Sequence, residues 1–259
     1  MRLAILSDIH GNPMALDAVL RDIAEHGGVD GYLVLGDLVA QGFDPAGALE
    51  RLAALPNAHF VRGNTDRYTL TDARPGPTIE QAQGDPDLVP LVVMVAQSFA
   101  WTHGALAATG WLDWLAALPL EQRLTLPDGT RLLAVHASPE RDDGRGVEPD
   151  ADDEELRCRF QGCHADLVCV GHTHRPLERH IPGVHIVNVG SVSNPPRDTS
   201  DRRPSYAMLE ANEDSYRITL HRAPLDPDAV IRAIEHSHVF TDRDWLISFY
   251  RSGVSANSG

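Results

Sequence analysis

The chain has 259 residues, 42% of them hydrophobic and 23% charged, a composition that is typical of a globular protein and argues against disorder. All 22 basic residues are arginine, and a sequence without lysine excludes P-loop NTPases and Schiff-base enzymes, which need the lysine amine. The formal net charge of -15 repels phosphate backbones at long range, so we expect no tight binding to long nucleic acids.

The N-terminal quarter of the chain predicts a β-α-β-α-β unit. Apolar runs predict strands over residues 3–6, 32–35 and 59–62. Helical spacing predicts one helix that runs from Ala15 to the Gly27-Gly28 pair and a second over residues 45–54. Polar residues follow the end of each strand, and in open α/β sheets this edge is where ligands bind.

The middle of the chain predicts a different order of elements. Residues 71–87 are rich in Pro, Gly and polar side chains and predict a loop, and helices are expected over 88–100 and 111–118. A Pro127-Asp128-Gly129 turn between two apolar runs then predicts a hairpin over 123–135. The predicted order of elements therefore changes here from alternating strands and helices to consecutive strands.

The C-terminal half predicts four further strands and two short helices. The strands are expected over residues 166–170, 185–189, 205–209 and 215–220, the last two antiparallel, and the helices over 228–236 and 244–250. We therefore divide the chain into a main domain over residues 1–223 and a C-terminal helical extension over 224–259.

An acidic run separates the hairpin from the next strand. Residues Glu140 to Glu155 hold nine acidic residues and two arginines, which predict a solvated loop leading into a helix near Leu156. Because this run begins shortly after His136, we expect its base to lie near any site that His136 helps to form.

Cysteine usage and apolar segments indicate the compartment. The three cysteines, Cys158, Cys163 and Cys169, form no CxxC pair, so we expect free thiols in a reducing environment. The N-terminal apolar run is too short for a signal peptide, and no apolar stretch approaches the roughly 20 residues of a membrane span. We expect a cytoplasmic protein with no membrane partner.

Five predicted strand ends carry side chains that can bind metal ions. They are Asp8 with His10, Asp37, Asn64, His136, and His172 with His174. This mixture of Asp, Asn and His suits Mn²⁺, Fe²⁺ or Zn²⁺, is too rich in nitrogen for Ca²⁺ or Mg²⁺, and lacks the thiolates of a structural zinc site. Seven ligands with one shared carboxylate would hold a pair of ions about 3.5–4 Å apart.

The same residues carry a resemblance to a known family. The blocks are Asp8-Ile9-His10-Gly11-Asn12, Gly36-Asp37, Gly63-Asn64-Thr65-Asp66, Val135-His136-Ala137-Ser138, Gly171-His172-Thr173-His174 and Asn188-Val189-Gly190-Ser191-Val192. In this order they resemble the calcineurin-like metallophosphoesterase superfamily, and the likeness covers about residues 1 to 222. It implies an α/β fold with two packed mixed β-sheets and helices outside.

The resemblance also implies the metal ligands and the reaction. Asp8, His10 and His174 would hold one divalent ion, Asn64, His136 and His172 a second, and Asp37 would bridge the two. A metal-bridging hydroxide would attack phosphorus in line, and we assign catalytic roles to Asp37, Asn64 and His136. We expect manganese as the resident metal, with iron, zinc or nickel as alternatives.

One position departs from the family pattern and bears on the substrate. Many members carry a histidine after the Gly-Asn pair that protonates the leaving group, and this chain has Thr65 there. Asp66 is ionised at neutral pH unless perturbed, and His103 is the other candidate acid. A missing acid favours phosphodiesters, phosphoanhydrides and activated phosphomonoesters, whose leaving groups need little protonation.

Two arginines are candidate phosphate ligands, because a guanidinium pairs with two phosphate oxygens at once: Arg67 and Arg197. We expect a small phosphorylated substrate, such as a nucleotide or dinucleoside polyphosphate, and a homodimer contact is one use for the C-terminal extension. The alternatives are a Ser/Thr-type protein phosphatase and a non-catalytic metal-binding scaffold.

Overall fold

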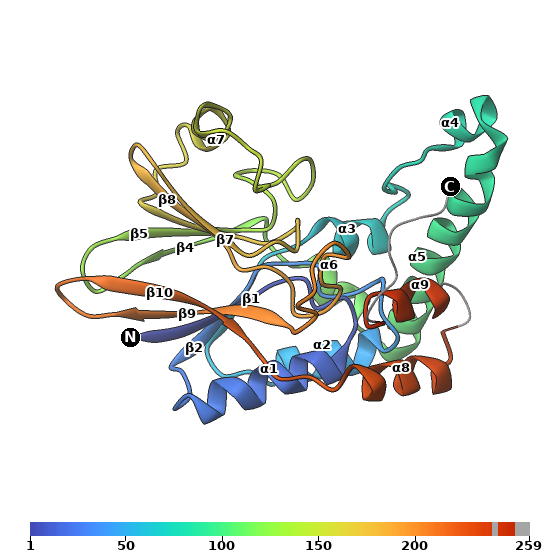
Figure 1. The fold of residues 1–259 in the computed structure, drawn as a ribbon, viewed down its shortest axis with the longest axis horizontal. Helices are drawn as coiled ribbons and strands as arrows, with labels where there is room; N and C mark the ends of the chain where they lie inside the picture. Colours follow the sequence, from blue (N-terminus) through green and yellow to red (C-terminus); the bar gives the residue numbers. More distant parts are fainter. Residues whose placement is uncertain (240–242, 252–259) are drawn as a thin grey trace.

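A computed structural model describes residues 1–239 and 243–251 of the chain. Two mixed five-stranded β-sheets pack face to face, with helices on their outer faces (Figure 1). The predicted fold class is therefore confirmed.

The first sheet has the order β10-β9-β1-β2-β3. Its parallel strands are β1 (Arg2–Leu6), β2 (Gly31–Val34) and β3 (Ala58–Phe60), and its antiparallel strands are β9 (Ser205–Ala211) and β10 (Tyr216–Arg222). Helices α1 (Pro13–Glu25) and α2 (Pro45–Ala53) make the crossovers between the parallel strands. Each begins at a side-chain cap, Asn12 for α1 and Asp44 for α2, which accepts an N–H of the first turn.

The second sheet has the order β4-β5-β6-β8-β7. It comprises β4 (Glu121–Thr125), β5 (Arg131–Val135), β6 (Leu167–Val170), β7 (Leu177–Ile181) and β8 (Val184–Asn188). Strand β7 was not predicted, because its residues Leu-Glu-Arg-His-Ile carry three charged or polar side chains in five. It forms the edge of the sheet, where polar side chains are tolerated and protect against pairing with other chains.

Successive side chains of each strand point to opposite faces of its sheet, and together they form three apolar layers. In β1, Leu3 and Ile5 face the layer between the two sheets, whereas Ala4 and Leu6 face α1 and α2. The layer between the sheets also receives Leu132 of β5 and Leu167 of β6. Helix α7 (Asp153–Phe160) covers the outer face of the second sheet. Both sheets therefore share one buried layer, which fixes their carboxyl ends relative to each other.

A helical arm, residues 64–116, follows β3. Its two ends pack against the main body, whereas its middle part projects beyond the sheets (Figure 1). It contains α3 (Asn64–Leu70), α4 (Ile79–Gly84), a 3₁₀ turn (Pro86–Leu88), α5 (Val89–Thr109) and α6 (Leu112–Ala116).

The arm corrects two predictions. The expected loop over 71–87 is correct for residues 71–78 but wrong from residue 79 on. There α4 begins at a capping box in which Thr78 Oγ1 accepts from Gln81 N and Gln81 Oε1 accepts from Thr78 N. The expected helix over 88–100 continues as α5 until Gly110, whose left-handed φ of 79° ends it.

Helix α5 also corrects the expectation about apolar segments. Pro86–Thr109 is a helical stretch of 24 residues that contains an 18-residue segment with a mean hydropathy of 1.4, long and apolar enough to cross a membrane by length and composition. Val89, Leu91 and Val93 are between 41% and 46% exposed on it. Core helices of soluble proteins pass the same test, so this helix alone assigns no membrane partner.

The C-terminal helices α8 (Pro227–His236) and α9 (Arg243–Ser248) form an apolar cluster of their own. Met14 of α1, Phe43 and Trp101 of α5 pack against it, so both helices rest on the main body. Residues 240–242 and 252–259 of the predicted extension lie outside the described residues. The division at residue 223 stays a prediction.

We predict that Tyr206→Phe lowers the free energy of unfolding by about 1–3 kcal/mol. Tyr206 is fully buried in β9, and its hydroxyl donates to Asp22 Oδ2 of α1 at 2.7 Å, so the change leaves a buried carboxylate oxygen without its donor. Urea denaturation measures the difference. Tyr32→Phe is the matched control, because the Tyr32 hydroxyl makes no hydrogen bond to any described residue, and an equal loss in both variants would contradict the prediction.

Candidate metal centre

The seven predicted ligands come together at the carboxyl ends of the parallel strands of both sheets. The loop after β1 carries Asp8 and His10, β2 leads to Asp37, β3 to Asn64, β5 to His136, and β6 to His172 and His174. All except His172 and His174 are at least nine-tenths buried, and the His174 side chain is 19% exposed. The group, called the metal cluster below, therefore opens to solvent on the side of the β6 loop.

Three of these ligands form one half of the metal cluster. His10 Nε2 lies 3.1 Å from His174 Nε2, and Asp8 Oδ1 lies 3.2 Å from His174 Nε2 and 3.8 Å from His10 Nε2. These are the three residues that the family resemblance assigned to one ion.

The other half is built around Asp37. Its Oδ1 lies 3.4 Å from His136 Nε2, and its Oδ2 lies 3.8 Å from His10 Nε2 in the first half. The Asn64 amide lies 3.1 Å from His136 Nε2 and 2.9 Å from His172 Nδ1. The two oxygens of Asp37 therefore face the two halves of the cluster.

Backbone carbonyls orient all four imidazoles. One ring nitrogen of each donates outward, and the acceptors are Ala40 O for His10 (3.3 Å), Leu35 O for His136 (2.6 Å), Gly144 O for His172 (2.7 Å) and Asn194 O for His174 (2.6 Å). The second nitrogen of each ring then carries a lone pair and points into the cluster. Three rings present Nε2 and His172 presents Nδ1.

Asp8 provides the observation that tests whether these residues fit a metal. Its Oδ2 accepts the backbone N–H of His172 at 3.0 Å, but its buried Oδ1 has no hydrogen-bond partner among the described residues. That oxygen faces the bare nitrogens of His10 and His174, so three lone pairs converge where a proton donor is missing. A divalent cation satisfies all three, and the donor set of nitrogen and carboxylate oxygen fits a borderline transition metal.

The charges within the cluster support ionised carboxylates. Burial alone would raise the pKa of Asp8 and Asp37, but the histidines beside them hold both pKa values below the ordinary range. Burial lowers the pKa of His10 to about 4, whereas Asp37 and Asp8 overcome burial and raise the pKa of His136 to about 10. Without a cation, His136 and Asp37 would thus share a proton that metal binding displaces.

The backbone at the ligands is unusual. Five ligands have left-handed φ: Asp8 (58°), His10 (47°), Asp37 (52°), His172 (69°) and His174 (60°). A residue other than glycine rarely adopts this conformation, and it persists only where the surroundings hold it. These five residues lie two to four positions past the ends of β1, β2 and β6, where the left-handed backbone turns the chain and directs the side chains into the cluster.

Asp66 is a structural residue that the sequence did not identify as such. Its carboxylate accepts backbone N–H groups from Gly63, Leu38 and Val39 at 2.9–3.2 Å, which ties the loop after β2 to the loop after β3. Burial and the charge of Asp37 raise the pKa of Asp66 to about 7. Because its oxygens face these amides, Asp66 is not directed at a leaving group.

The C-terminal helices contribute Tyr250, which no local sequence signal marked. Its hydroxyl lies 2.7 Å from Asn12 Nδ2 and 3.0 Å from Ser193 Oγ, and all three groups are buried. Asn12 follows the His10 loop, and Ser193 precedes Asn194, whose carbonyl orients His174. Tyr250 therefore connects the loop that carries His10 to the loop after β8 that orients His174.

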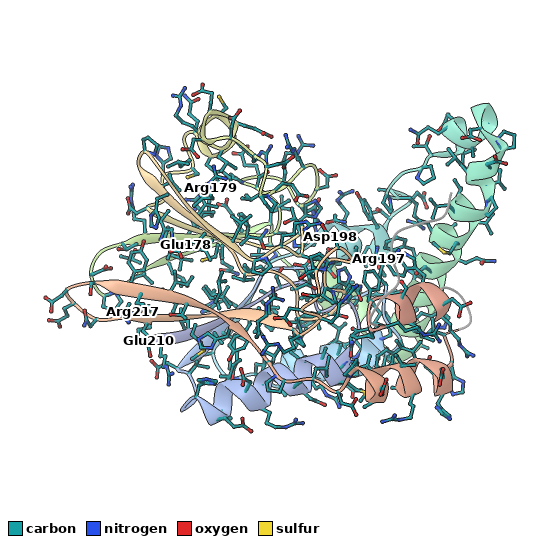
Figure 2. The ribbon with its side chains drawn as sticks, viewed as in Figure 1. Glu178, Arg179, Arg197, Asp198, Glu210 and Arg217 are labelled. Carbon is teal, nitrogen blue, oxygen red and sulfur yellow. The ribbon has the colours of Figure 1, made fainter. Side chains whose placement is uncertain are left out.

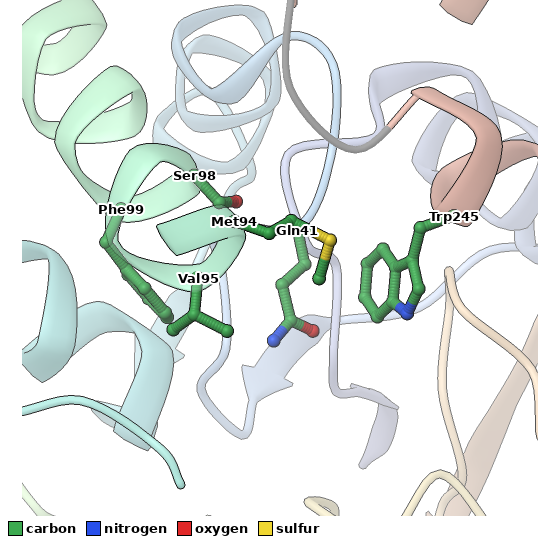
Figure 3. Close-up of a pocket in the computed structure, with 6 residues that line it drawn as sticks. All are labelled: Gln41, Met94, Val95, Ser98, Phe99 and Trp245. Atoms are coloured by element: carbon green, nitrogen blue, oxygen red, sulfur yellow. The ribbon is translucent and has the colours of Figure 1, made fainter. Parts of the chain in front are cut away.

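A small apolar pocket lies between the arm and the C-terminal helices (Figure 3). The pocket is lined by four residues of α5, by Trp245 of α9 and by Gln41. The residues of α5 are Met94, Val95, Ser98 and Phe99. Gln41 follows Ala40, whose carbonyl orients His10, so the pocket adjoins a loop that supports the metal cluster.

The two arginines predicted to bind phosphate are placed differently. Arg67 of α3 is bonded to Asp142 Oδ1 and Oδ2 at 2.8–3.0 Å and to Asp143 at 2.8 Å, so two carboxylates already match its charge. Arg197 lies in the loop after β8, with its guanidinium 4.6 Å from the Phe249 ring centre and 5.4 Å from that of Trp245 (Figure 2). Their assignment to substrate stays a prediction.

The acidic run is only partly the solvated loop that was expected. Asp142 is 5% exposed and pairs with Arg62 as well as Arg67, and Val147 is fully buried. Its base does lie at the metal cluster, because Gly144 O accepts from His172. The predicted helix near Leu156 is confirmed as α7. Arginine pairing explains the burial, since it removes the cost of desolvating an isolated carboxylate.

Comparisons with known proteins agree with this geometry. A model of the calcineurin-like phosphoesterase superfamily domain matches residues 1–214. An uncharacterised protein of Methanocaldococcus jannaschii is 28% identical over 242 residues, which cover 86% of this chain and 88% of that protein.

Two solved structures are similar over nearly the whole chain. A metallophosphoesterase from Sphaerobacter thermophilus has a TM-score of 0.72 and 28% identity, covering 96% of this chain and 98% of that one. A hypothetical protein from Pyrococcus horikoshii OT3 has a TM-score of 0.73 at 18% identity, covering 90% and 92% respectively, and shares the fold.

We predict that Gly63→Ala weakens both stability and metal binding. A Cβ at Gly63 would overlap the backbone nitrogen and Oδ1 of Asp37, so the shared carboxylate must move. Overpacking of this kind costs about 1–3 kcal/mol of unfolding free energy. Urea denaturation and metal content by mass spectrometry are the measurements.

Gly104→Ala in α5 is the control for that substitution. Nothing lies within 4 Å of its added Cβ, so the change should stabilise the helix by up to about 1 kcal/mol and leave metal content unchanged. Normal metal content in Gly63→Ala would show that the close approach of Gly63 does not position Asp37.

Proposed function

Because this chain belongs to the calcineurin-like phosphoesterase superfamily and is a metal-dependent phosphoester hydrolase, we propose that it uses two divalent ions to hydrolyse small phosphodiesters, phosphoanhydrides or activated phosphomonoesters. The observation that carries the proposal is Asp37. Its two oxygens face His136 and His10 in different halves of the metal cluster. A single carboxylate shared in this way supports a pair of ions rather than one.

Each half of the cluster would hold one ion. Asp8, His10 and His174 are the ligands of the first, Asn64, His136 and His172 those of the second, and Asp37 serves both. Two bound divalent ions supply Lewis-acid stabilisation of phosphate oxygens and lower the pKa of an attacking water. We propose manganese because the ligands are nitrogen and oxygen without thiolate, with iron, zinc and nickel as alternatives.

The chain's own residues prepare the site for that chemistry. The carbonyls of Ala40, Leu35, Gly144 and Asn194 hold the imidazoles in their ligating tautomers. Burial at Asp8 and His136 keeps bulk water from competing with the phosphate oxygens. Asn64 and His136, on neighbouring loops, would position the phosphoryl group while they ligate.

The environment of Thr65 supports a restricted choice of leaving group. Thr65 is 2% exposed, its hydroxyl donates to Val39 O at 2.9 Å, and its N–H donates to Asp37 Oδ1 at 2.8 Å. The side chain thus points away from the cluster and offers no proton to a leaving oxygen. Phosphoserine would leave as a basic alkoxide, which argues against the alternative of a Ser/Thr-type protein phosphatase.

Charge supports a small substrate. Asp142 and Asp143 neutralise Arg67 beside the cluster, and the chain as a whole has a net charge of -15. The negative charge of the protein would repel each of the many phosphates of a long polyanion, whereas a nucleotide or dinucleoside polyphosphate has only a few phosphates to be repelled. We therefore propose a small phosphorylated compound as the substrate.

Asp37→Asn tests the two-metal proposal. The amide oxygen can still accept from Thr65 N, so the fold is retained while the charge shared by both ions is lost. We expect turnover of a chromogenic phosphodiester to fall by about 100-fold or more, beyond the 10–100-fold typical of a residue that only orients a ligand. Metal content by mass spectrometry should fall at both positions.

Two further measurements accompany the Asp37 variant. Asp214→Asn makes the same chemical change in the exposed β9–β10 turn and should leave turnover and metal content unchanged. Chelation should abolish turnover in the unmodified protein, and Mn²⁺ should restore it best. Two tightly bound ions and normal turnover in Asp37→Asn would rule out the shared ligand.

The leaving-group proposal predicts a steep dependence of rate on leaving-group pKa. Without an acid, the departing oxygen carries its developing negative charge unprotonated in the transition state. Aryl and nucleotide esters, which have weakly basic leaving groups, should therefore react readily and alkyl esters poorly. A general acid would recover about 10²–10⁴-fold on the alkyl esters. The measurement is a rate series over phosphodiesters of graded leaving-group pKa.

His103→Ala is the control for the rate series. His103 Nδ1 lies 2.9 Å from Thr69 O, so the ring contacts α3 rather than the metal cluster, and its loss should leave the slope unchanged. A flat series in the unmodified protein, or a slope that steepens in His103→Ala, would show that an acid is present after all.

A further inference from the structure

A second group of metal-ligating side chains lies on the β7–β8 hairpin, remote from the metal cluster. Glu178 and His180 lie two residues apart on β7 and so share one face of the strand, and His185 of β8 is the register partner of His180. Because β8 runs parallel to β6, whose carboxyl end leads to the metal cluster, His185 at the start of β8 lies at the opposite edge of the sheet. Figure 2 shows Glu178 well separated from Arg197, which lies on the loops near the metal cluster.

The three side chains converge closely. The imidazoles of His180 and His185 stack with their centres 4.0 Å apart, and Glu178 Oε1 lies 2.9 Å from His185 Nε2 and 3.5 Å from His180 Nε2. One ligand atom from each of the three lies within 4.8 Å of the other two. This spacing allows a single ion to contact all three.

His185 is the group that points to a ligand. It is 8% exposed, and its Nδ1 lies 2.9 Å from the Tyr216 hydroxyl of β10 in the other sheet. Its buried Nε2 makes no hydrogen bond to any described residue, because Glu178 Oε1 is close but poorly aligned for one. When Nδ1–H donates to Tyr216, the Nε2 lone pair faces a carboxylate oxygen of Glu178, an arrangement that a cation bound to both would stabilise.

The guanidinium nearest along the chain does not supply that cation. Arg179, the residue between Glu178 and His180, points to the other face of β7 and pairs with Asp153. The hairpin thus places two imidazoles and one carboxylate around a position that lacks a cation from the protein.

We propose that Glu178, His180 and His185 form a separate site for one divalent transition-metal ion, which we call the hairpin site. Two nitrogens and one carboxylate oxygen are the ligand set of zinc, and water would complete the tetrahedral shell. Tyr216 orients His185 from the opposite sheet, so a bound ion would connect β7, β8 and β10 at the open edge of the sandwich. Its role is structural, and it does not depend on the proposed function of the metal cluster.

Zinc binding to the full-length protein tests the hairpin site. The unmodified protein and His180→Ala are dialysed against the same Zn²⁺ solution and analysed for bound zinc. The metal cluster is identical in both, so the difference counts the hairpin site alone. We expect one equivalent less zinc in His180→Ala and a smaller rise in melting temperature on adding zinc, with equal phosphoesterase activity.

Two variants make that result decisive. His180 is 71% exposed, so His180→Ala should fold normally, and His236→Ala on the exposed face of α8 controls for the loss of any surface histidine. Glu178→Gln keeps the side-chain shape and should weaken zinc binding at least about 10-fold. Equal zinc content and equal thermal shifts in the unmodified protein, His180→Ala and His236→Ala would overturn the proposal.

Discussion

The rest of this structure depends on the convergence of imidazole nitrogen and carboxylate oxygen in one buried volume. His10, His136, His172 and His174 each donate one ring N–H to a backbone carbonyl, which directs the second nitrogen into the cluster. Asp8 Oδ1 faces the nitrogens of His10 and His174 without a hydrogen-bond donor, and His136 and Asp37 share a proton that metal binding displaces. Such an arrangement is unfavourable alone because the lone pairs repel, and it becomes favourable when a cation lies among them. The loops around it consequently have to be rigid enough to hold the repelling groups together.

That rigidity comes from the packing of the two sheets. The loops after β1, β2 and β3 of the first sheet provide four ligands, and the loops after β5 and β6 of the second provide three. The apolar layer between the sheets includes Ile5 and Leu167. Its packing fixes the strand ends of one sheet relative to those of the other. Asp66 then joins two of the loops within the first sheet, and Asn188 Nδ2, which donates to Gly171 O at 2.8 Å, braces the β6 loop in the second.

Sequence reasoning predicted most of the strands and picked out the candidate ligands that the structure brings together, because both leave local signals. An apolar run followed by Gly and a polar side chain marks a strand end, and five such ends in the right order are specific. It missed β7, whose polar side chains suit an edge strand, and α4, whose Thr78–Gln81 capping box lay within a stretch rich in Pro and Gly. It named Arg67 as a phosphate ligand but did not predict its pairing with Asp142 and Asp143, because these carboxylates lie 75 and 76 residues away in the chain. Tertiary partners of this kind have no counterpart in the spacing of residues along the chain.

The contact between Tyr250 and Asn12 has a consequence for the order in which the molecule forms. The two residues are separated by 238 positions, and β1 likewise needs β9, which begins at Ser205, as its antiparallel neighbour. Contacts between distant parts of a chain form slowly, because the intervening loop must close before they contribute. The loop that carries Asp8 and His10 therefore gains its last contact only after residues 205–250 have been synthesised and have folded back onto it.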